Sequence, residues 1–568
     1  MNTIKRRSGL SIVLPDAFKL LEAELQHDES LISDILPELP ELPETPELPD
    51  LPELPEGPKL LLDTLEEFKG RDKLIQSMLK KGFQQMDQLE LEPVSLLPPE
   101  GLKLIGRLAK RQTFKMSLPV LPSEHAVVLL EQDGMYTWSF PQPKLPEVPK
   151  VEASDDGTLL KQVETAGEKL LDFEFSVESD AGEDQPKERG LLGNFLADKI
   201  KAYVLKFAGD WVVGQTAEFL ERDIQQGLIS MPSSTLEDWK PGVDLSSVAS
   251  RSDRPARILL FIHGTFSSTK GAFGALTASE YGKKFLETAL ANYDAVIGFD
   301  HKTLSVDPKV NATDLLTTLS QYQWNQPPHF DVVTHSRGGL VFRSFAELVL
   351  PGATWKAGFD HIVFVAAANG GTLMAEPENW QYLIDLYTNL AVAAEKVIGV
   401  ISGNPATGDL LGEMLSGIGN FIQWFSTAAI TDKAVPGLAA MEPDGDFIRT
   451  INQTQPGQPT AETSNYFAVV ADFEPKLLGR HEPKELSKRL LQWVADGVVD
   501  ELMRGTANDL VVDTPSMTRI DPQAGNFIKD KLDFGKTPEV YHTVYFTRQE
   551  VTDAFMLDSY SVTVVSIC

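Results

Sequence analysis

The 568-residue sequence predicts an α/β fold, with a mainly parallel sheet in the second half of the chain and a smaller mixed α+β domain before it. Short apolar runs alternate there with helical stretches, which is typical of βαβ units. One such run leads through a glycine-rich turn into a helix, and parallel sheets bind their ligands at this end of the strands. A chain of this length is also expected to hold two or three domains.

Six runs are predicted to be strands of this sheet because each is short, apolar and rich in β-branched or aromatic residues. In chain order they are Arg257–Ile262, Ala295–Phe299, Phe330–Thr334, His361–Ala367, Tyr466–Ala471 and Val540–Phe546. The ligand crevice of a parallel sheet lies at the carboxyl ends of its strands. The residues that follow these runs are therefore where we expect chemistry.

The stretch from Phe330 to Ser344, FDVVTHSRGGLVFRS, is predicted to form a strand, a tight turn and a helix. Gly338 and Gly339 let the chain turn sharply, and Leu340–Val349 resumes at helical spacing. Ser336 lies at the apex of this turn, which makes it a candidate nucleophile. The alternative is a buried serine on a purely structural turn.

Composition and charge exclude several classes of protein. A formal net charge of -31 argues against binding nucleic acid and against electrostatic docking on an anionic membrane, since both favour Lys and Arg. The single cysteine, Cys568, excludes an internal disulfide framework and fits a cytoplasmic location. The basic residues Lys5, Arg6 and Arg7 precede an apolar run that Pro15 cuts too short for a signal peptide. With no uninterrupted 18-residue apolar span, no transmembrane helix is predicted.

Residues 1–59 are predicted to contain a short helix within Asp16–Leu36 and then an acidic linker. A proline recurs at every third position from Pro37 to Pro58, and Glu or Asp follows each one except the last. Polyproline II has three residues per turn, so the repeat forms a proline stripe, an acidic stripe and a leucine stripe along a stiff rod. We interpret the rod as a spacer or exposed arm. The alternative is that its leucine stripe docks a protein partner.

Residues 60–185 are predicted to form a small α+β accessory domain. Asp133-Gly134 separates two apolar runs and is a strong β-hairpin signal. The predicted elements are helices within Leu60–Met86 and Glu100–Arg111, the hairpin His125–Phe140 and a strand over Leu171–Val177. No motif with recognisable chemistry falls in this domain.

Residues 186–250 are predicted to be a helical connector, because Leu191–Ile229 carries apolar residues at helical spacing. A helix lying on a membrane surface usually has a basic polar face. Packing against the following domain is therefore the favoured interpretation.

Residues 251–568 carry two motifs in order. His263–Ser267, HGTFS, follows one predicted strand, and Thr334–Gly339, THSRGG, follows another. Together they resemble the α/β-hydrolase superfamily, in particular its bacterial lipase-like members. The family pattern G-x-S-x-G has glycine where this chain has Thr334. That position lies at a strand end and needs a small residue, so threonine changes the motif more than the geometry.

The resemblance implies a catalytic triad in the chain order Ser, Asp or Glu, then His. Three histidines follow Ser336. His361 opens a predicted strand, at the wrong edge of the sheet, and His481 lies in a charged helical stretch. His542 is therefore the expected general base, which serine needs in order to become a nucleophile.

The acidic member of the triad is expected at Asp509. Gly505–Val512, GTANDLVV, resembles the N-D-G-x-V segment that carries the triad aspartate in lipases, with Leu510 in place of glycine. Asp472, which directly follows a predicted strand, and Asp513 are the alternatives. The carboxylate is expected to hold the imidazole in its correct tautomer and to stabilise the charged form.

An oxyanion hole is expected from backbone N–H groups. The resemblance implies the N–H of Arg337, directly after the nucleophile, and the N–H of Thr265 or Phe266. His263 and His335 are expected to have structural roles. Arg337 is expected to make a local salt bridge or to meet an acidic group of the substrate.

An insertion at about residues 372–450 separates two predicted strands. It contains two apolar helical stretches, Trp380–Ser402 and Asp409–Ile430, and is predicted to cap the active site. Phe421, Trp424 and Phe425 are expected to contact the substrate. Such a cap implies a hydrophobic acyl group and allows transient membrane contact. The alternative is that the two helices are simply part of the core.

The resemblance implies a serine esterase or lipase, including phospholipase-like enzymes, that forms an acyl-enzyme on Ser336 and needs no cofactor. The sequence contains no D-x-D-x-D-G calcium loop. The alternative is a regulated or inactive hydrolase-fold interaction module. By analogy with similar bacterial domains, that module is a toxic effector controlled by its amino-terminal region.

Overall fold

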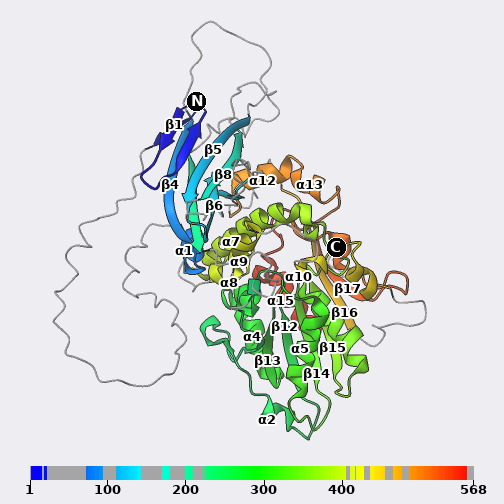
Figure 1. Cartoon of the computed structure of the whole chain (residues 1–568). Coiled ribbons are helices and arrows are strands. Elements are labelled where there is room, and N and C mark those ends of the chain that lie inside the picture. The colour runs from blue at the N-terminus through cyan, green and yellow to red at the C-terminus, as the bar shows by residue number, and fades with distance from the viewer. Residues whose placement is uncertain are drawn as a thin grey trace, which may run out of the picture.

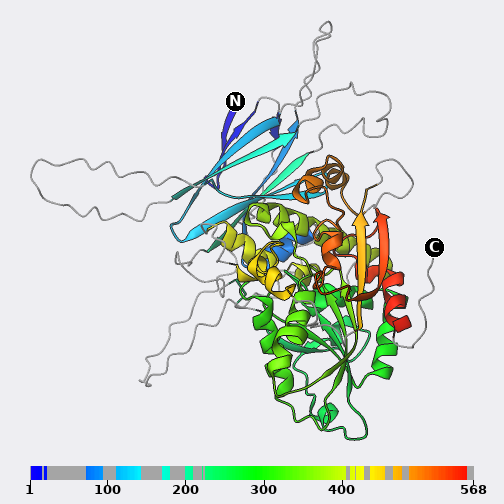
Figure 2. The same ribbon diagram turned by 90° about the vertical axis from the view of Figure 1, so that its right-hand side faces the viewer.

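The structure is a computed structural model of the chain and has three layers. An amino-terminal β-sandwich, a layer of helices and a larger α/β domain follow one another along the molecule (Figures 1 and 2). The described residues are 2–15, 18–21, 72–93, 111–142, 169–178, 199–208, 220–221, 224–403, 410–415, 417–427, 435–453, 465–475 and 485–558.

Two antiparallel sheets form the sandwich. The first has the order β1 (Asn2–Lys5), β2 (Ser11–Leu14), β5 (Arg111–Val120) and β8 (Lys169–Glu178). The second has the order β3 (Phe18–Leu21), β4 (Gln84–Pro93), β9 (Ile200–Ala208), β6 (Glu124–Gln132) and β7 (Met135–Ser139). Buried side chains of both sheets share one core, among them Ile12 and Phe114 from the first and Leu89 and Val128 from the second.

The strand β9 corrects the predicted helical connector, because Ile200–Ala208 pairs with β4 on one side and β6 on the other. Ala202 and Val204 pack in the sandwich core, while Tyr203 and Leu205 pack on the opposite face of the sheet. A strand buried on both faces loses the alternation of apolar and polar residues that identifies a half-buried strand. The small domain therefore extends past residue 185 and includes Ile200–Ala208 of the predicted connector.

Other amino-terminal predictions have mixed outcomes. The helix expected within Asp16–Leu36 is wrong at Phe18–Leu21, which is β3, and the rest of that range lies outside the described residues, as does the repeat from Pro37 to Pro58. The hairpin is confirmed, with Asp133 (φ 51°) and Gly134 (φ 74°) between β6 and β7. Within the described part of Leu60–Met86, only α1 (Lys73–Lys80) is helical.

The α/β domain is built on an eight-stranded sheet. Its order is β11 (Lys240–Pro241), β10 (Gly227–Ser230), β13 (Ala295–Asp300), β12 (Arg257–Ile262), β14 (His329–His335), β15 (Gly358–Val365), β16 (Asn465–Phe473) and β17 (Ile528–Thr537). The strands from β12 to β17 pair in parallel, and β10 and β11 pair antiparallel at one edge.

The strand predicted over Val540–Phe546 is wrong, because β17 forms this edge of the sheet from Ile528 to Thr537. Most of β17 is polar and at least partly exposed, so it carries no apolar run that identifies a strand. Val540–Phe546 is apolar because its loop packs into the core, and Tyr541 and Tyr545 are almost fully buried.

Helices cover both faces of the sheet. The crossovers from β12 to β13 and from β13 to β14 run in opposite directions along the sheet, so right-handed connections place α4 (Glu280–Asn292) and α5 (Pro308–Ser320) on opposite faces. The chain thus leaves β12 and β14 toward opposite faces. A crevice opens at the carboxyl ends of two such strands, which is where ligands bind in open α/β sheets.

The remaining helices complete the domain and the layer above it. The cap insertion contains α7 (Trp380–Ser402), α8 (Leu410–Met414) and α9 (Ile418–Phe425), close to the two predicted helical stretches. The others are α2 (Ser246–Ala249), α3 (Thr269–Phe273), α6 (Gly338–Arg343), α10 (Pro436–Ala439), α11 (Asp446–Ile451), α12 (Lys488–Ala495), α13 (Val498–Leu502), α14 (Thr514–Met517) and α15 (Gln549–Asp558).

The cap helices lie between the sandwich and the α/β domain (Figures 1 and 2). Side chains of α7 bind the backbone of edge strand β7: Asn389 accepts from the N–H of Tyr136 at 2.8 Å and donates to its C=O at 2.6 Å, and Asp385 accepts from the N–H of Trp138 at 2.7 Å. The indole of Trp138 also donates to Thr388 at 3.1 Å. The outer face of α7 is therefore joined to the sandwich.

Candidate active site

Ser336 lies directly after β14, on a turn that leads into α6. Its φ of 53° is in the left-handed region, which non-glycine residues rarely adopt and which is typical of sharp strand-to-helix turns at functional sites. The backbone of Ser336 makes hydrogen bonds on both sides of the residue. Its N–H donates to the C=O of Val365 at 3.0 Å, and its C=O accepts from the N–H of Gly339 at 3.1 Å. The turn is thus tied to the next strand, β15.

Glycines allow this turn to lie against the loop after β12. A Cβ atom on Gly338 would lie 2.2 Å from the carbonyl oxygen of Ile262, and one on Gly264 would lie 2.6 Å from the Cβ of Ser336. Neither contact is possible between real atoms. Thr334, where the family pattern has glycine, is an ordinary residue of β14 that pairs with Ile262 and Phe364.

The structure brings His542 and Asp509 to this serine. The Nε2 of His542 lies 3.0 Å from the Oγ of Ser336, and its Nδ1 lies 2.9 Å from the Oδ2 of Asp509. The N–H of His542 also donates to the carbonyl oxygen of Asp509 at 3.0 Å. The carboxylate cannot donate, so Nδ1 carries the proton and Nε2 is free to accept one from Ser336.

The carboxylate of Asp509 is held from both sides. Its Oδ1 accepts from the N–H groups of Val511 at 3.1 Å and Val512 at 2.8 Å. Its Oδ2 accepts from the hydroxyl of Tyr545 at 3.1 Å as well as from His542. Leu510, which replaces the glycine of the lipase pattern, has a φ of 81°, the conformation that glycine adopts without strain.

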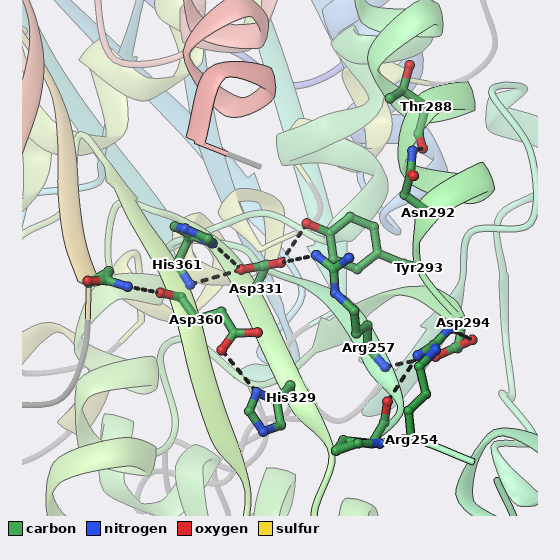
Figure 3. Close-up of polar contacts among 12 residues, drawn as sticks. Arg254, Arg257, Thr288, Asn292, Tyr293, Asp294, His329, Asp331, Asp360 and His361 are labelled. Atoms are coloured by element: carbon green, nitrogen blue, oxygen red, sulfur yellow. Dashed lines mark hydrogen bonds and ion pairs between the residues drawn. The ribbon is translucent and has the colours of Figure 1, made fainter. Parts of the chain in front are cut away.

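The alternative histidine His361 does not reach the serine. His361 lies in β15 toward the amino ends of the strands, where its Nδ1 contacts Asp331 at 2.8 Å and Tyr293 donates to the same carboxylate at 2.6 Å (Figure 3). His361, Asp331 and Tyr293 line an open pocket between α4, α15 and the sheet. His481 lies outside the described residues.

The alternative acids also lie apart from the imidazole. Asp472 is in β16 and accepts from the N–H of Asn508 at 3.4 Å. Asp513 precedes α14, and burial raises its pKa to about 6. Neither carboxylate has a hydrogen bond to His542, whose acidic partner is Asp509.

Two backbone N–H groups next to the serine are unpaired. Within the described ranges, the N–H groups of Thr265 and Arg337 donate to no protein acceptor. The N–H of Phe266, the other expected donor, is engaged with the hydroxyl of Thr303 at 3.3 Å. Of the two residues considered after β12, Thr265 is therefore the one whose N–H is available.

His263 and His335 lie in structural surroundings. His335 is buried and lies against His542, and burial lowers its pKa to about 3. It is therefore neutral and donates from Nε2 to the carbonyl oxygen of His542 at 3.0 Å, which steadies that loop. His263 stacks on His301 at 4.1 Å between ring centroids and accepts from its N–H at 3.2 Å.

The side chain of Arg337 points away from the bulk solvent and is fully buried. It donates from Nη2 to the carbonyl oxygen of Val306 at 2.7 Å, and burial lowers its pKa to about 10. The carboxylates of Glu221 and Asp307 oppose this shift. The buried guanidinium therefore lies within the electrostatic influence of these two carboxylates.

The cap covers the serine and its partners. Ser336 is 3% exposed, and Asp509 and His542 are 0% exposed. On the inner face of α7, the hydroxyl of Tyr387 donates to the carbonyl oxygen of Thr265 at 3.1 Å. Its ring centroid lies 6.2 Å from that of His542. Helix α7 of the cap therefore lies against both the loop after β12 and His542.

The three expected cap residues differ in their surroundings. Phe421 lies 5.4 Å from the ring of Phe266, next to the serine. Trp424 stacks on Phe421 at 5.6 Å, one layer further out. Phe425 packs edge-on against Phe140 at the end of the sandwich, 4.7 Å between centroids. Only Phe421 therefore reaches the loop beside the serine.

Sequence reasoning did not find three residues around the site. Tyr545 bonds Asp509 and lies three residues after His542, a spacing that offers a weak signal. Tyr387 is one aromatic residue among many on a long apolar helix, and Glu221 lies in the connector. Only the folded chain brings these residues to the site.

The described residues bring no three His, Cys, Asp or Glu side chains together in a group suited to a metal ion. None of their helices combines the length and apolar character needed to cross a membrane.

The fold and the site define an α/β protein in which a serine, a histidine and an aspartate meet at the carboxyl edge of a mostly parallel sheet. A family model described as a domain of unknown function, DUF7379, matches residues 226–557, which is more than half of the chain. The chain belongs to this family. A second model, also described as a domain of unknown function, DUF7362, matches residues 59–207.

No curated protein matches the sequence. Among solved structures, lipase 1 from Pelosinus fermentans is 11% identical, with a TM-score of 0.37 and coverage of 55% of this chain and 100% of that one. An esterase from Thermogutta terrifontis is 14% identical, with a TM-score of 0.29 and coverage of 58% and 97%.

Phospholipase PlaB from Legionella pneumophila is 13% identical, with a TM-score of 0.27 and coverage of 46% of this chain and 45% of that one. The similar region thus spans less than half of PlaB. These TM-scores and identities carry no argument about activity, so any assignment of function depends on the residues of this chain.

Proposed function

We propose that this protein is a serine hydrolase of carboxylic esters. The observation that carries the proposal is the pair of contacts made by His542, 3.0 Å to the Oγ of Ser336 and 2.9 Å to Asp509. A serine hydroxyl is a weak nucleophile at neutral pH and needs a general base that a third group orients. The three residues have this arrangement, on the sharp turn that presents the serine.

In the proposed reaction, His542 takes the proton of Ser336 as Oγ attacks the ester carbonyl carbon. Asp509 stabilises the imidazolium that forms. The imidazolium then gives its proton to the leaving alcohol, and an acyl-enzyme remains on Ser336. Water attacks this ester with His542 again as the base, which releases the carboxylic acid and restores the serine.

The oxyanion hole is assigned to the N–H groups of Thr265 and Arg337. Both are unpaired within the described residues and flank the serine from the loops after β12 and β14. Loss of one such donor typically lowers the rate by about 100- to 1,000-fold. Phe266 has a supporting role, since its N–H is engaged with Thr303.

An apolar acyl group is the proposed substrate feature. Phe266, Phe421 and Tyr387 form an aromatic cluster beside the serine, with rings 5.3 to 5.4 Å apart. Trp424 extends this surface. This cluster supports an esterase with lipase- or phospholipase-like substrates.

A second candidate is a regulated hydrolase-fold module. One observation favours it, which is the burial of the whole site under a cap that the sandwich holds from outside. Membrane contact through the cap would need this outer surface to become free. In this candidate the site is closed until the sandwich moves.

A fluorophosphonate probe tests both candidates on the full-length protein. We expect covalent labelling of wild type and none of Ser336→Ala, with hydrolysis of nitrophenyl esters lost in parallel. A chain-length series of these esters should favour medium or long acyl groups. Absence of serine-dependent labelling, even under mild conditions that loosen the cap, would rule out the hydrolase. The full chain is used because truncation near residue 185 leaves β9 behind and breaks the sandwich.

A further inference from the structure

Glu221, in the segment between the two family matches, is fully buried and lies against the loop after β13. Its carboxylate accepts from the N–H groups of Thr303, Leu304 (2.9 Å) and Ser305 (2.8 Å). The hydroxyls of Thr303 and Ser305 add bonds of 2.9 and 2.7 Å. Three successive N–H groups that converge on one carboxylate form an anion-binding nest. Both oxygens of Glu221 therefore have several donors.

The hydroxyl of Thr303 connects Glu221 to the loop beside the serine. Its proton is donated to Glu221, which as a carboxylate only accepts. The oxygen of Thr303 is thereby left to accept from the N–H of Phe266 at 3.3 Å. Phe266 has a φ of 59°, a conformation that its surroundings must hold in place. Thr265 directly precedes Phe266, so holding Phe266 in place also helps to hold Thr265. In the proposed mechanism the N–H of Thr265 faces the serine.

The charge of Glu221 also acts on Arg337, whose backbone N–H is the second donor of the proposed oxyanion hole. Arg337 is buried, and within the described residues its guanidinium has one hydrogen bond, to Val306. Glu221 is the first of two carboxylates that counter the effect of burial on its pKa. A buried cation needs such a counter-charge in order to remain in place. Glu221 thus stabilises the residue on each side of the proposed oxyanion hole.

The connector that carries Glu221 is itself fixed to the cap. The carbonyl oxygen of the neighbouring Leu220 accepts from Asn420 of α9 at 2.9 Å. The same short segment therefore contacts the cap and the loop behind the oxyanion hole. Burying a carboxylate is unfavourable because the group loses its hydration, even when five donors bind it. A role in the active site would explain why the connector nevertheless places Glu221 here.

We propose that Glu221 is a positioning residue for the oxyanion hole, acting through Thr303 on Phe266 and Thr265 and through its charge on Arg337. The proposal rests on the ester hydrolase function given above. It assigns a role in the reaction to the connector, outside the residues that the DUF7379 model matches. A purely structural role predicts lost stability with normal turnover in the molecules that remain folded.

The test compares Glu221→Gln and Thr303→Val with wild type, using p-nitrophenyl butyrate and a trifluoromethyl ketone that mimics the tetrahedral intermediate. Gln keeps the shape of Glu but turns an NH2 group toward N–H donors. Val keeps the shape of Thr but removes the oxygen that Phe266 needs. Because the oxyanion forms only in the transition state, we expect kcat to fall about 10-fold or more while KM changes by less than about threefold. The inhibition constant of the ketone should rise in proportion.

Two other variants separate positioning from stability. Ser305→Ala removes one hydroxyl from Glu221 without breaking the bond to Phe266, so its loss in kcat should be smaller than that of Thr303→Val. Glu347 is also a buried carboxylate, and its hydrogen-bond donors are Arg343 and Tyr466 rather than residues of the loops beside the serine. Glu347→Gln should lower thermal stability with little effect on kcat per active site titrated by a fluorophosphonate.

The outcomes are distinct. If wild type hydrolyses the ester, and folded Glu221→Gln and Thr303→Val keep kcat and ketone affinity within about twofold, the inference is wrong. If only Glu221→Gln fails to fold, Thr303→Val decides. If wild type neither hydrolyses esters nor labels at Ser336, the proposed function fails, and the inference with it.

Discussion

Leu510 shows how a single residue departs from a family pattern while the geometry of the site is kept. It has a φ of 81° where the lipase pattern has glycine, and its side chain is 1% exposed. The strain of this conformation is of order 1–3 kcal/mol, and burial of a leucine side chain contributes about as much in the opposite direction. Packing therefore offsets the strain, and Asp509 still reaches His542.

Asp513 is the residue whose charge state makes a prediction about pH. Burial raises its pKa from an ordinary value of 3.8 to about 6. Folding therefore favours the protonated carboxyl. This contribution to stability is complete below about pH 3.8 and is lost as pH rises through 6.

Asp513→Asn removes the buried carboxylate but keeps its shape. We expect this variant to be more stable than wild type at pH 8, by about 1–3 kcal/mol, and to lose about half of that advantage at pH 5. Urea unfolding at the two pH values measures the difference. An equal difference at both values would contradict the assigned shift.

At the scale of elements, α7 is the middle of a three-layer arrangement. Its outer face carries Asp385, Thr388 and Asn389, which pair with the backbone and indole of β7. Its inner face carries Tyr387, which lies between the loop after β12 and His542. The edge strand β7 thus explains why this apolar helix carries buried polar residues on one face, since they pair with the exposed backbone of that strand.

Asn389→Ala tests this pairing of helix and strand. The substitution leaves a buried N–H and a buried C=O of Tyr136 unpaired, so we expect a loss of about 1–3 kcal/mol in the free energy of unfolding. The control is Gln381→Ala on the same helix, whose exposed side chain makes a single bond of 3.3 Å to Trp138. That change should cost less than about 0.5 kcal/mol. Chemical denaturation measures both variants. If Asn389→Ala and Gln381→Ala lose similar free energies of unfolding, Asn389 has no specific role.

At the scale of the whole molecule, the cap helices lie between the sandwich and the α/β domain (Figure 2). Because α7 is hydrogen-bonded to strand β7, we expect the site to open only when the sandwich moves. The sandwich also meets the α/β domain at the β6–β7 hairpin, where a Cβ on Gly134 would lie 3.5 Å from the Cβ of Ser487. This spacing is within the range of a disulfide bond.

A disulfide between Gly134→Cys and Ser487→Cys, in a Cys568→Ser background, should hold the two domains together. We expect the oxidised protein to react more slowly with a bulky fluorophosphonate-rhodamine, with little change for a small organophosphate. A difference in labelling rate of about 5- to 30-fold corresponds to 1–2 kcal/mol in the opening equilibrium. Reduction should restore the rate. Equal rates before and after reduction would show that substrate enters without movement of the sandwich.

The sequence alone predicted the parts of this protein that local chemistry specifies. Five of the six predicted strands of the α/β sheet, the turn at Ser336 and the hairpin at Asp133-Gly134 follow from β-branched runs and glycines, which limit the backbone over a few residues. The resemblance also selected Ser336, Asp509 and His542, and the structure brings these three together.

Only the tertiary structure decided which faces meet. It made β9 a strand between two others, moved the last strand of the sheet to β17, and placed the sandwich on the outer face of α7. It also carried Glu221 to a loop more than eighty residues away in the chain. Burial on both faces removes the sequence periodicity of a strand, and a contact between distant segments leaves no local pattern in either one.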